Sequence, residues 1–255
     1  MSWHFFFESI AYAVAFRIYV AQRRTAGDFL DTSTRWNIII AAVAGAAIGS
    51  KLLYCFENPP LTAQNWTNVA YLLAGKTMVG GLLGGTIAVE IAKRSTGLRR
   101  RTGDLFAIPL AVGIAIGRIG CFLAGKQDDT YGIPTSLPWG LDLGDGIRRH
   151  PVQLYEMAAM LILAFLLARV SQPKFAEGDR FRIFVLAYYS WRLLIDFLKP
   201  GVRYEGLTVL QWVCAAALVW YARDLWRIAL TAADWSEHPA MLSQPHPATG
   251  ERTRG

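Results

Sequence analysis

The stretch "DLFAIPLAVGIAIGRIGCFLAG", residues 104–125, decides the fold because it is long, apolar and charged only at Asp104 and Arg118. Its length is close to the ~20 residues that an α-helix needs to cross a bilayer. Similar runs recur along the chain, such as "WNIIIAAVAGAAIGSKLLYCF" at 36–56 and "MAAMLILAFLLARV" at 157–170. A large soluble helical domain would need polar helix faces that these runs lack. The sequence therefore predicts an all-α, polytopic integral membrane protein.

Apolar runs of this kind divide the chain into seven predicted spans. They cover residues 3–22, 36–56, 69–92, 104–124, 152–170, 181–198 and 207–230. The N-terminus has no basic segment before its apolar run, which argues against a cleaved signal peptide. We expect one transmembrane domain over residues 1–235 and a disordered cytoplasmic tail over 236–255, which is rich in proline, threonine and charge.

Basic residues are distributed unevenly between the two sides of such a bundle. With seven spans, one side carries 16 lysines and arginines, and the other side carries 5. The positive-inside rule therefore places the C-terminus in the cytoplasm and the N-terminus outside. The basic run "KRSTGLRRR", residues 93–101, is typical of a topology signal beside anionic lipid. We expect no nucleic-acid partner.

Two sequence features indicate packing between spans rather than chemistry. The motif "GGLLGG", residues 80–85, twice places glycines four residues apart, a spacing that lets helix backbones approach closely. The three cysteines, Cys55, Cys121 and Cys214, are widely spaced in apolar segments. That arrangement argues against a disulfide framework or a thiolate metal cluster, and we expect neither a metal nor a cofactor.

Five ionisable residues, Lys51, Glu90, Arg118, Arg192 and Asp196, fall inside apolar runs. Each costs on the order of 2.5–3.5 kcal/mol at the middle of a bilayer, so we expect them to face a shared polar cavity. Arg192 and Asp196 are four residues apart and therefore share one helix face. One interpretation is an ion pair that holds the bundle together. The other is a phosphate site, because a guanidinium group binds phosphate through two parallel hydrogen bonds.

The loop over residues 125–151 is rich in turn-forming residues and leads into the next span through "RRHPVQLYE", residues 148–156. Pro151 suits the first turn of that helix. Gln153, Tyr155 and Glu156 are then near the outer surface. His150 alone is equally consistent with a helix cap or an interface histidine. Beside an intramembrane arginine, this cluster predicts a polar site that opens from the outer leaflet.

Several motifs carry a family resemblance. "GRIGCFLAG" at 117–125 is similar to Gly-Arg-x-Gly-Asn-Phe-x-Asn-Gly, and "RHPVQLYE" at 149–156 is similar to Arg-His-Pro-Ser-Gln-Leu-Tyr-Glu. "AIGSKLLY" at 47–54, "TMVGGLLGG" at 77–85 and "YYSWRLLIDFLKPG" at 188–201 match further segments in the same order. Together they resemble the prolipoprotein diacylglyceryl transferase family, which are bacterial inner-membrane enzymes. These enzymes move diacylglyceryl from phosphatidylglycerol to the lipobox cysteine of a preprotein.

The resemblance implies partners and residue roles. The partners would be phosphatidylglycerol or a similar anionic phospholipid and a lipobox-bearing preprotein. Arg118 and Arg192 would bind the phosphate, Asp196 would orient Arg192, and His150, Glu156 or a phosphate oxygen would accept the proton. The implied lipid-binding residues are Lys51, Tyr54, Gly80, Gly81, Gly117, Gly120, Gln153 and Tyr155.

The chain also departs from the family pattern at several positions. Val79 stands where the family has a histidine important for activity, and a valine has no group that takes a proton. Cys121 and Ala124 replace two asparagines, Lys126 replaces a glutamate, and Asp196 replaces another glutamate. The resemblance therefore implies the fold and the lipid site more directly than it implies the activity.

Two other functions stay open at this point. The departures are consistent with a non-catalytic or repurposed phospholipid-binding relative that has a different acceptor. The buried charges are consistent with a transporter that uses them as a relay, and such a protein would carry ions or solutes across liposomes. The sequence shows no inverted repeat of the kind that many transporters have.

Overall fold

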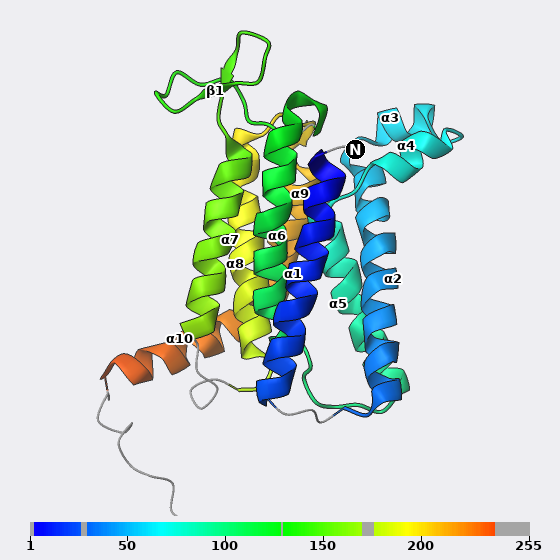
Figure 1. Ribbon diagram of the computed structural model, residues 1–255, viewed down its shortest axis with the longest axis vertical. Coiled ribbons are helices and arrows are strands. Elements are labelled where there is room, and N and C mark those ends of the chain that lie inside the picture. Colours follow the sequence, from blue (N-terminus) through cyan, green and yellow to red (C-terminus); the bar gives the residue numbers. More distant parts are fainter. Residues whose placement is uncertain (1–2, 27–29, 129, 170–175, 238–255) are drawn as a thin grey trace, which may run out of the picture.

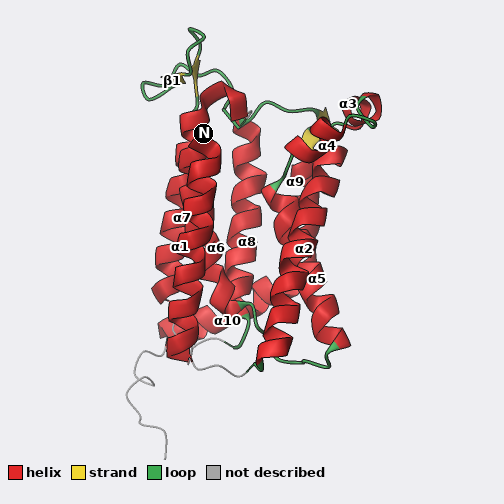
Figure 2. Ribbon diagram, turned by 45° about the vertical axis from the view of Figure 1, so that its right-hand side comes forward, coloured by secondary structure: helices red, strands yellow, loops and turns green. Residues whose placement is uncertain are grey.

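The computed structural model describes residues 3–26, 30–128, 130–169 and 176–237. Most of these residues are helical, and long helices stand side by side in a bundle (Figures 1 and 2). Strands within the described ranges are confined to two short hairpins. The prediction of a mostly helical protein is therefore confirmed.

Seven helices of the described residues stand in the body of the bundle. They are α1 (Trp3–Ala26), α2 (Thr32–Glu57), α5 (Met78–Ser95), α6 (Asp104–Ala124), α7 (Val152–Arg169), α8 (Asp179–Ile195) and α9 (Val209–Trp220). The remaining helical elements are α3 (Pro59–Gln64), α4 (Val69–Ala74), η1 (Gly125–Asp128), η3 (Asp196–Leu198) and α10 (Ala222–Glu237).

Both hairpins lie at one end of the bundle, which we call the hairpin end (Figure 2). In the first, β1 (Leu141–Asp142) pairs antiparallel with β2 (Arg148–Arg149). In the second, β3 (Arg203–Tyr204) pairs antiparallel with β4 (Leu207–Thr208). In the described residues, the strands thus lie in the loops between α6 and α7 and between α8 and α9.

The helices pack in pairs, some distant in the sequence and some consecutive. α1 runs along α6, α2 runs along α5, α7 packs on α6, and α8 packs on α9. One apolar cluster joins α6, α7, α8 and α9, and its fully buried members include Ala111, Leu167, Phe184 and Cys214. α6 lies at the centre of this cluster, and Arg118 on α6 is therefore buried inside the protein.

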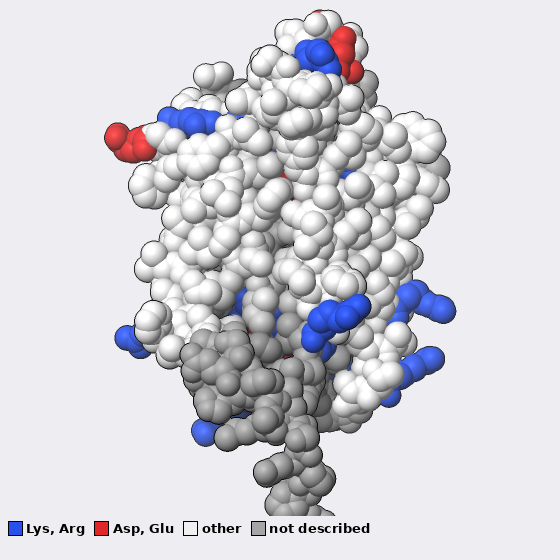
Figure 3. All heavy atoms as spheres, turned by 90° about the vertical axis from the view of Figure 1, so that its left-hand side faces the viewer, with Lys and Arg blue, Asp and Glu red and all other residues white. Residues whose placement is uncertain are grey.

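The surface of the bundle suits a membrane. Three helices, α2, α6 and α7, are long and apolar enough to cross a bilayer. Large apolar side chains are exposed along the bundle, including Val43 on α2, Phe165 on α7 and Val219 on α9. Figure 3 shows lysines and arginines gathered toward the ends of the molecule, with a broad band almost free of charge between them. A bilayer would cover this band and bury its apolar atoms.

The predicted span at 69–92 is wrong in its first part, because a non-helical segment at residues 75–77 separates α4 from α5. Gly75 has an extended backbone, with φ −73° and ψ 144°. The Thr77 side chain then caps α5 by accepting a hydrogen bond from the backbone N–H of Gly80. A hydropathy pattern does not reveal this break, because the segment lies between two apolar runs.

The predicted span at 207–230 is also wrong at both ends. Its first two residues form β4, and α9 begins at Val209 after a capping box between Thr208 and Gln211. α9 ends at Trp220, and α10 extends across the opposite end of the bundle in Figure 1. α10 continues to Glu237, so the predicted domain boundary at 235 falls inside a helix. The predicted tail from residue 238 onward lies outside the described residues.

Glycines allow α2 and α5 to touch backbone to backbone. A Cβ atom at Gly84 would lie 2.3 Å from the carbonyl oxygen of Gly45, and one at Gly49 would lie 2.4 Å from that of Gly80. Real Cβ atoms do not approach so closely, so a larger residue would force these helices apart. The close contact expected from the "GGLLGG" motif is therefore confirmed.

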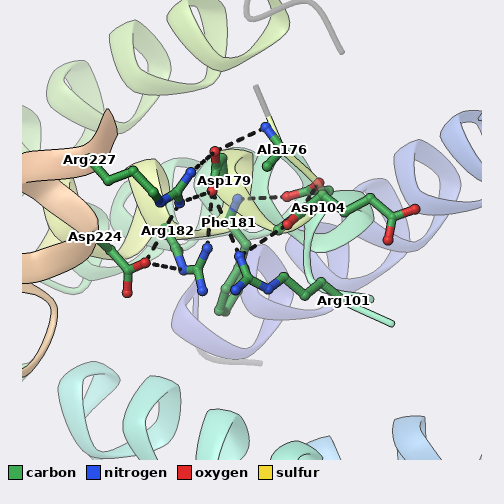
Figure 4. A network of polar contacts seen from close by, with 10 residues as sticks. Arg101, Asp104, Ala176, Asp179, Phe181, Arg182, Asp224 and Arg227 are labelled. Atoms are coloured by element: carbon green, nitrogen blue, oxygen red, sulfur yellow. Dashed lines mark hydrogen bonds and ion pairs between the residues drawn. The ribbon is translucent and has the colours of Figure 1, made fainter. Parts of the chain in front are cut away.

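At the end opposite the hairpins, a buried carboxylate joins three elements (Figure 4). Asp179, at the start of α8, is 1% exposed. Its carboxylate accepts hydrogen bonds from Arg182 at 3.0 Å and from Arg227 of α10 at 2.9 Å. Asp104 of α6 caps the same helix from outside by accepting hydrogen bonds from the backbone N–H groups of Gly178 and Phe181, at 2.7 and 3.0 Å. These contacts fix the ends of α6, α8 and α10 relative to one another.

We expect Asp179→Asn to lower the free energy of unfolding by about 3 kcal/mol, since removing one partner from a buried ion pair leaves the other charges uncompensated. Denaturant unfolding in detergent, followed by circular dichroism, measures the loss. Asp224→Asn is the control, because Asp224 pairs with Arg182 at 3.2 Å but is partly exposed, and it should cost less than about 1 kcal/mol. Equal losses of unfolding free energy in the two variants would contradict the conclusion that the buried ion pairs of Asp179 stabilise the fold more than the partly exposed pair of Asp224.

Candidate functional site

The Glu156 carboxylate lies at the centre of a buried cluster of charges. Glu156 is 2% exposed and belongs to the first turns of α7. Its Oε2 atom lies 2.6 Å from Nε of Arg118 on α6. Its Oε1 atom accepts hydrogen bonds from Arg192 of α8 and, at 3.0 Å, from Nζ of Lys199. One carboxylate therefore brings together cations from three separate parts of the chain.

Local structure explains how these side chains are positioned. Pro151 starts α7, and its carbonyl accepts hydrogen bonds from Leu154 and Tyr155, so Glu156 lies in the first turns. Arg192 and Asp196 are one turn apart where α8 passes into η3, and Arg192 Nη2 lies 2.8 Å from Asp196 Oδ1. The hydroxyl group of Thr208 also donates to Asp196, at 3.4 Å. The ends of α7 and α8 are therefore fixed beside each other.

The side chains of the cluster that contact one another directly include one more cation than carboxylates, and Glu57 of α2 lies only within electrostatic reach of them. Arg118, Arg192 and Lys199 face the carboxylates of Glu156 and Asp196, and all five side chains are largely buried. Burying an excess cation is costly unless an anion compensates it. The arrangement is therefore suited to an anionic ligand.

Several polar atoms beside the cluster have no hydrogen-bond partner within the described residues. The donors among them are Nε of Arg192, the hydroxyl group of Tyr188 and Nε2 of Gln153, and the acceptors are Oε2 of Glu156 and Oδ1 of Asp196. Tyr188 lies one turn before Arg192 on α8, and Gln153 lies three residues before Glu156 on α7. Buried donors are normally satisfied. A ligand with several acceptor oxygens, such as a phosphate ester, would satisfy them.

The hairpin end forms a polar cover next to this cluster. The Tyr155 hydroxyl group accepts a hydrogen bond from Nε1 of Trp139 at 2.7 Å and lies 3.4 Å from Nδ1 of His150. In the first hairpin, Arg149 and Lys126 bond to Asp145 at 2.6 and 2.8 Å. These two hydrogen bonds hold the pKa of the Asp145 carboxyl well below its usual range. Lys126 occupies the position where the family has a glutamate. Through its contact with Asp145, it connects η1 to the first hairpin.

The other predicted lipid-binding residues mostly make contacts between helices. Lys51 donates to the carbonyl oxygen of Gly75 at 2.6 Å, and the ring of Tyr54 packs against that of Tyr71 with centroids 5.5 Å apart. Gly80 packs against α2. A Cβ atom at Gly120 would lie 2.9 Å from Phe7 of α1. These residues contact neighbouring parts of the protein, and their binding of lipid stays a prediction.

The two remaining glycines of the predicted set differ from each other. A Cβ atom at Gly81 would make ordinary contacts of 3.6–3.7 Å with α2. A Cβ atom at Gly117 would meet nothing within 4 Å. Gly117 precedes Arg118, so the backbone beside this arginine borders open space.

Sequence reasoning missed two residues of this region. The hydropathy pattern places Lys199 in a loop, although it lies three residues after Asp196 and seven after Arg192, a spacing that repeats one helix face. Glu57, at the end of α2, lies within electrostatic reach of Arg192, Lys199 and Asp196. A glutamate at the end of an apolar run is common at ordinary helix ends, so the sequence alone did not mark Glu57 as part of this region.

Val79 and Cys121 are two further family departures that lie buried inside the bundle. Val79 is 1% exposed and packs in the apolar cluster with α6 and α8. Cys121 is buried, and its Sγ atom lies 3.8 Å from Nη1 of Arg118 and 3.9 Å from Nδ1 of His4. The α5 position thus has no titratable group, while a histidine of α1 lies beside Cys121, which contacts Arg118.

The fold and this site define a class of protein: a mostly helical protein with apolar helices long enough to cross a membrane and a buried cluster of arginine, lysine and carboxylate side chains. The sequence model of the prolipoprotein diacylglyceryl transferase family matches residues 3–226, and the chain belongs to this family.

Three relatives show the extent of the similarity, and each is named phosphatidylglycerol–prolipoprotein diacylglyceryl transferase. The protein of Bordetella parapertussis is 30% identical over 222 residues, which cover 80% of this chain and 83% of that protein. The protein of Cupriavidus metallidurans is 34% identical and covers 72% of this chain and 71% of its own length. The protein of Clostridium tetani is 31% identical, with coverages of 66% and 69%.

Proposed function

We propose that this protein transfers a diacylglyceryl group from phosphatidylglycerol to the cysteine thiol of a prolipoprotein. The observation that carries the proposal is the meeting of Arg118 and Arg192 on one buried carboxylate, beside donors that have no partner within the described residues. Membership of the transferase family supports it. The proposal includes seven spans in the bacterial inner membrane, and the distribution of basic residues favours an orientation with the N-terminus and the site toward the outer leaflet.

In the proposed reaction, the acceptor thiol attacks the glyceryl carbon that carries the phosphate. A carbon–sulfur bond forms as the carbon–oxygen bond breaks, glycerol phosphate leaves, and the thiol proton passes to a base. Negative charge gathers on the leaving phosphate. Arg118 and Arg192 each retain N–H groups beyond those that bind Glu156, and donors held in place before the reaction stabilise such charge best.

The other residues of the cluster have positioning roles in this proposal. Asp196 holds Arg192, while Glu156 sets the separation of the two guanidinium groups. Lys199 adds a third cation, and Tyr155 and His150 order the mouth at the hairpin end.

The test is turnover by the purified full chain in detergent with phosphatidylglycerol and a lipobox peptide. We expect release of glycerol phosphate and a gain of one diacylglyceryl group in the peptide mass. A peptide with serine in place of the lipobox cysteine is the control and should stay unmodified. If no glycerol phosphate is released with the lipobox peptide or any other thiol acceptor, the proposal is wrong.

A second candidate function is a phospholipid-binding relative without turnover. Val79 favours it, because this buried apolar side chain stands where the family has its histidine. In that case phosphatidylglycerol would bind, Arg118→Ala and Arg192→Ala would abolish the binding, and no glycerol phosphate would appear. The same preparation therefore separates the two functions.

A further inference from the structure

The transfer reaction needs a group that accepts the thiol proton, since a free cysteine has a pKa of about 8.5. Val79 has no such group. Glu156 is a poor acceptor because Arg118, Arg192 and Lys199 all bind its carboxylate, so that a proton would disrupt three ion pairs. The base must therefore come from another element.

His4, on the first turn of α1, lies beside the phosphate-binding arginine of α6. Gly120 makes this possible, because a Cβ atom at that position would lie 3.3 Å from Cα of His4. The Nδ1 atom of His4 lies 3.9 Å from Sγ of Cys121, which in turn lies 3.8 Å from Nη1 of Arg118. The imidazole is thus separated from the guanidinium group by one small side chain. Its side chain is 31% exposed, so substrate has access to it.

The other ring nitrogen of His4 faces a carboxylate. Nε2 lies 3.7 Å from Oε2 of Glu8, one turn further along α1. Glu8 is held in turn by Lys76, at 2.7 and 2.8 Å, and by the hydroxyl group of Tyr12 at 3.1 Å. A carboxylate on one ring nitrogen orients the imidazole and stabilises the cation that forms when the other nitrogen takes a proton.

The second histidine of the described residues has a different environment. His150 lies in the cover at the hairpin end, where its Nδ1 atom contacts the hydroxyl group of Tyr155. Its backbone packs against Gly132, whose Cβ position would lie 2.5 Å from the carbonyl oxygen of His150. Of these two histidines, only His4 is linked through Cys121 to Arg118 and also has a carboxylate partner.

We propose that His4 accepts the proton of the acceptor thiol and takes the part that a histidine at position 79 has in the family. This inference rests on the proposed function. The S–H proton passes to Nδ1 of His4, the thiolate attacks the glyceryl carbon, and the carbon–oxygen electron pair leaves with glycerol phosphate. Glu8 stabilises the imidazolium until it releases its proton to solvent.

The test compares His4→Gln with wild type in the glycerol phosphate assay between pH 5.5 and 9. General-base catalysis contributes about 10²–10⁴-fold, so we expect kcat to fall at least about 10²-fold while KM for phosphatidylglycerol changes little. The dependence of the rate on pH should differ between the two proteins, because only the wild type has a general base at position 4. Ser9→Ala, on the exposed side of α1, is the matched control and should keep the wild-type rate.

A second variant separates chemistry from folding. Imidazole added to His4→Ala should raise its rate, and the same addition should leave Ser9→Ala unchanged. A His4→Gln protein with the wild-type rate and pH profile would overturn the role of His4 and leave the transferase proposal intact. So would a His4→Ala protein that is inactive and unresponsive to imidazole although it unfolds at the wild-type temperature. Absence of release by wild type would instead overturn the transferase proposal, and this inference with it.

Discussion

Arg118→Lys and Arg192→Lys should each lower the rate of glycerol phosphate release by about 10²–10³-fold, the usual cost of losing one donor to a developing oxyanion. Lysine keeps the positive charge but lacks the planar fork that binds two phosphate oxygens at once. The effect should appear in kcat as well as in KM, because the leaving phosphate is more negative in the transition state than in bound lipid. Release assays with phosphatidylglycerol vesicles measure both constants.

Arg203→Lys is the control for this pair. Arg203 lies in the exposed β3 strand and donates to the carbonyl oxygen of Phe197, outside the charge cluster. It should keep the wild-type rate. If Arg118→Lys and Arg192→Lys also keep it, a positive charge alone suffices and bidentate binding of phosphate is wrong.

Glu156→Gln should lower the free energy of unfolding by about 3–5 kcal/mol, because it leaves Arg118, Arg192 and Lys199 close together without their shared anion. This loss is the largest that we expect from one uncharged substitution of similar shape. Denaturant unfolding in detergent measures it. Glu177→Gln is the control, because the pair of Glu177 with Arg100 is about half exposed and should be worth less than about 1 kcal/mol.

The double variant Glu156→Gln, Lys199→Gln tests the cause of that loss. Adding Lys199→Gln to the Glu156→Gln protein removes one uncompensated cation, so the double variant should be more stable than Glu156→Gln alone. Substitutions in one charge network are not additive, and this difference measures their coupling. Two losses that simply add would show that packing, rather than charge balance, governs stability there.

The sequence identified the main part of the charge cluster for a simple energetic reason. A charge inside an apolar run is too costly to face lipid, and Arg118, Arg192 and Asp196 meet beside Glu156 in the structure. The same reasoning does not say which charges share a cavity. Lys51 contacts a carbonyl group near α4, and Glu90 pairs with Lys93 on its own helix.

The features that sequence reasoning missed depend on backbone geometry or on folding in three dimensions. The break at residues 75–77 comes from an extended glycine and a threonine cap within an apolar region. The contact of His4 with Cys121 joins residues 117 positions apart. A hydropathy profile averages the side chains of one sequence window, and the one-turn spacing compares residues of one helix. Neither indicates which helices lie next to each other in the folded protein.

The capping of α8 by Asp104 has a consequence for donor choice. Arg118 is 14 residues beyond Asp104 on α6, and Arg192 is 13 residues beyond Asp179 on α8, so each helix is pinned about 20 Å from its arginine. Glu156 contacts both arginines near the hairpin end. Polar contacts therefore connect α6 and α8 at both ends of the bundle. If the two arginines bind phosphate as proposed, this frame sets their separation, and they would bind the phosphate whatever alcohol is attached to it. Discrimination among phospholipids with different head alcohols must then come from the loops at the hairpin end.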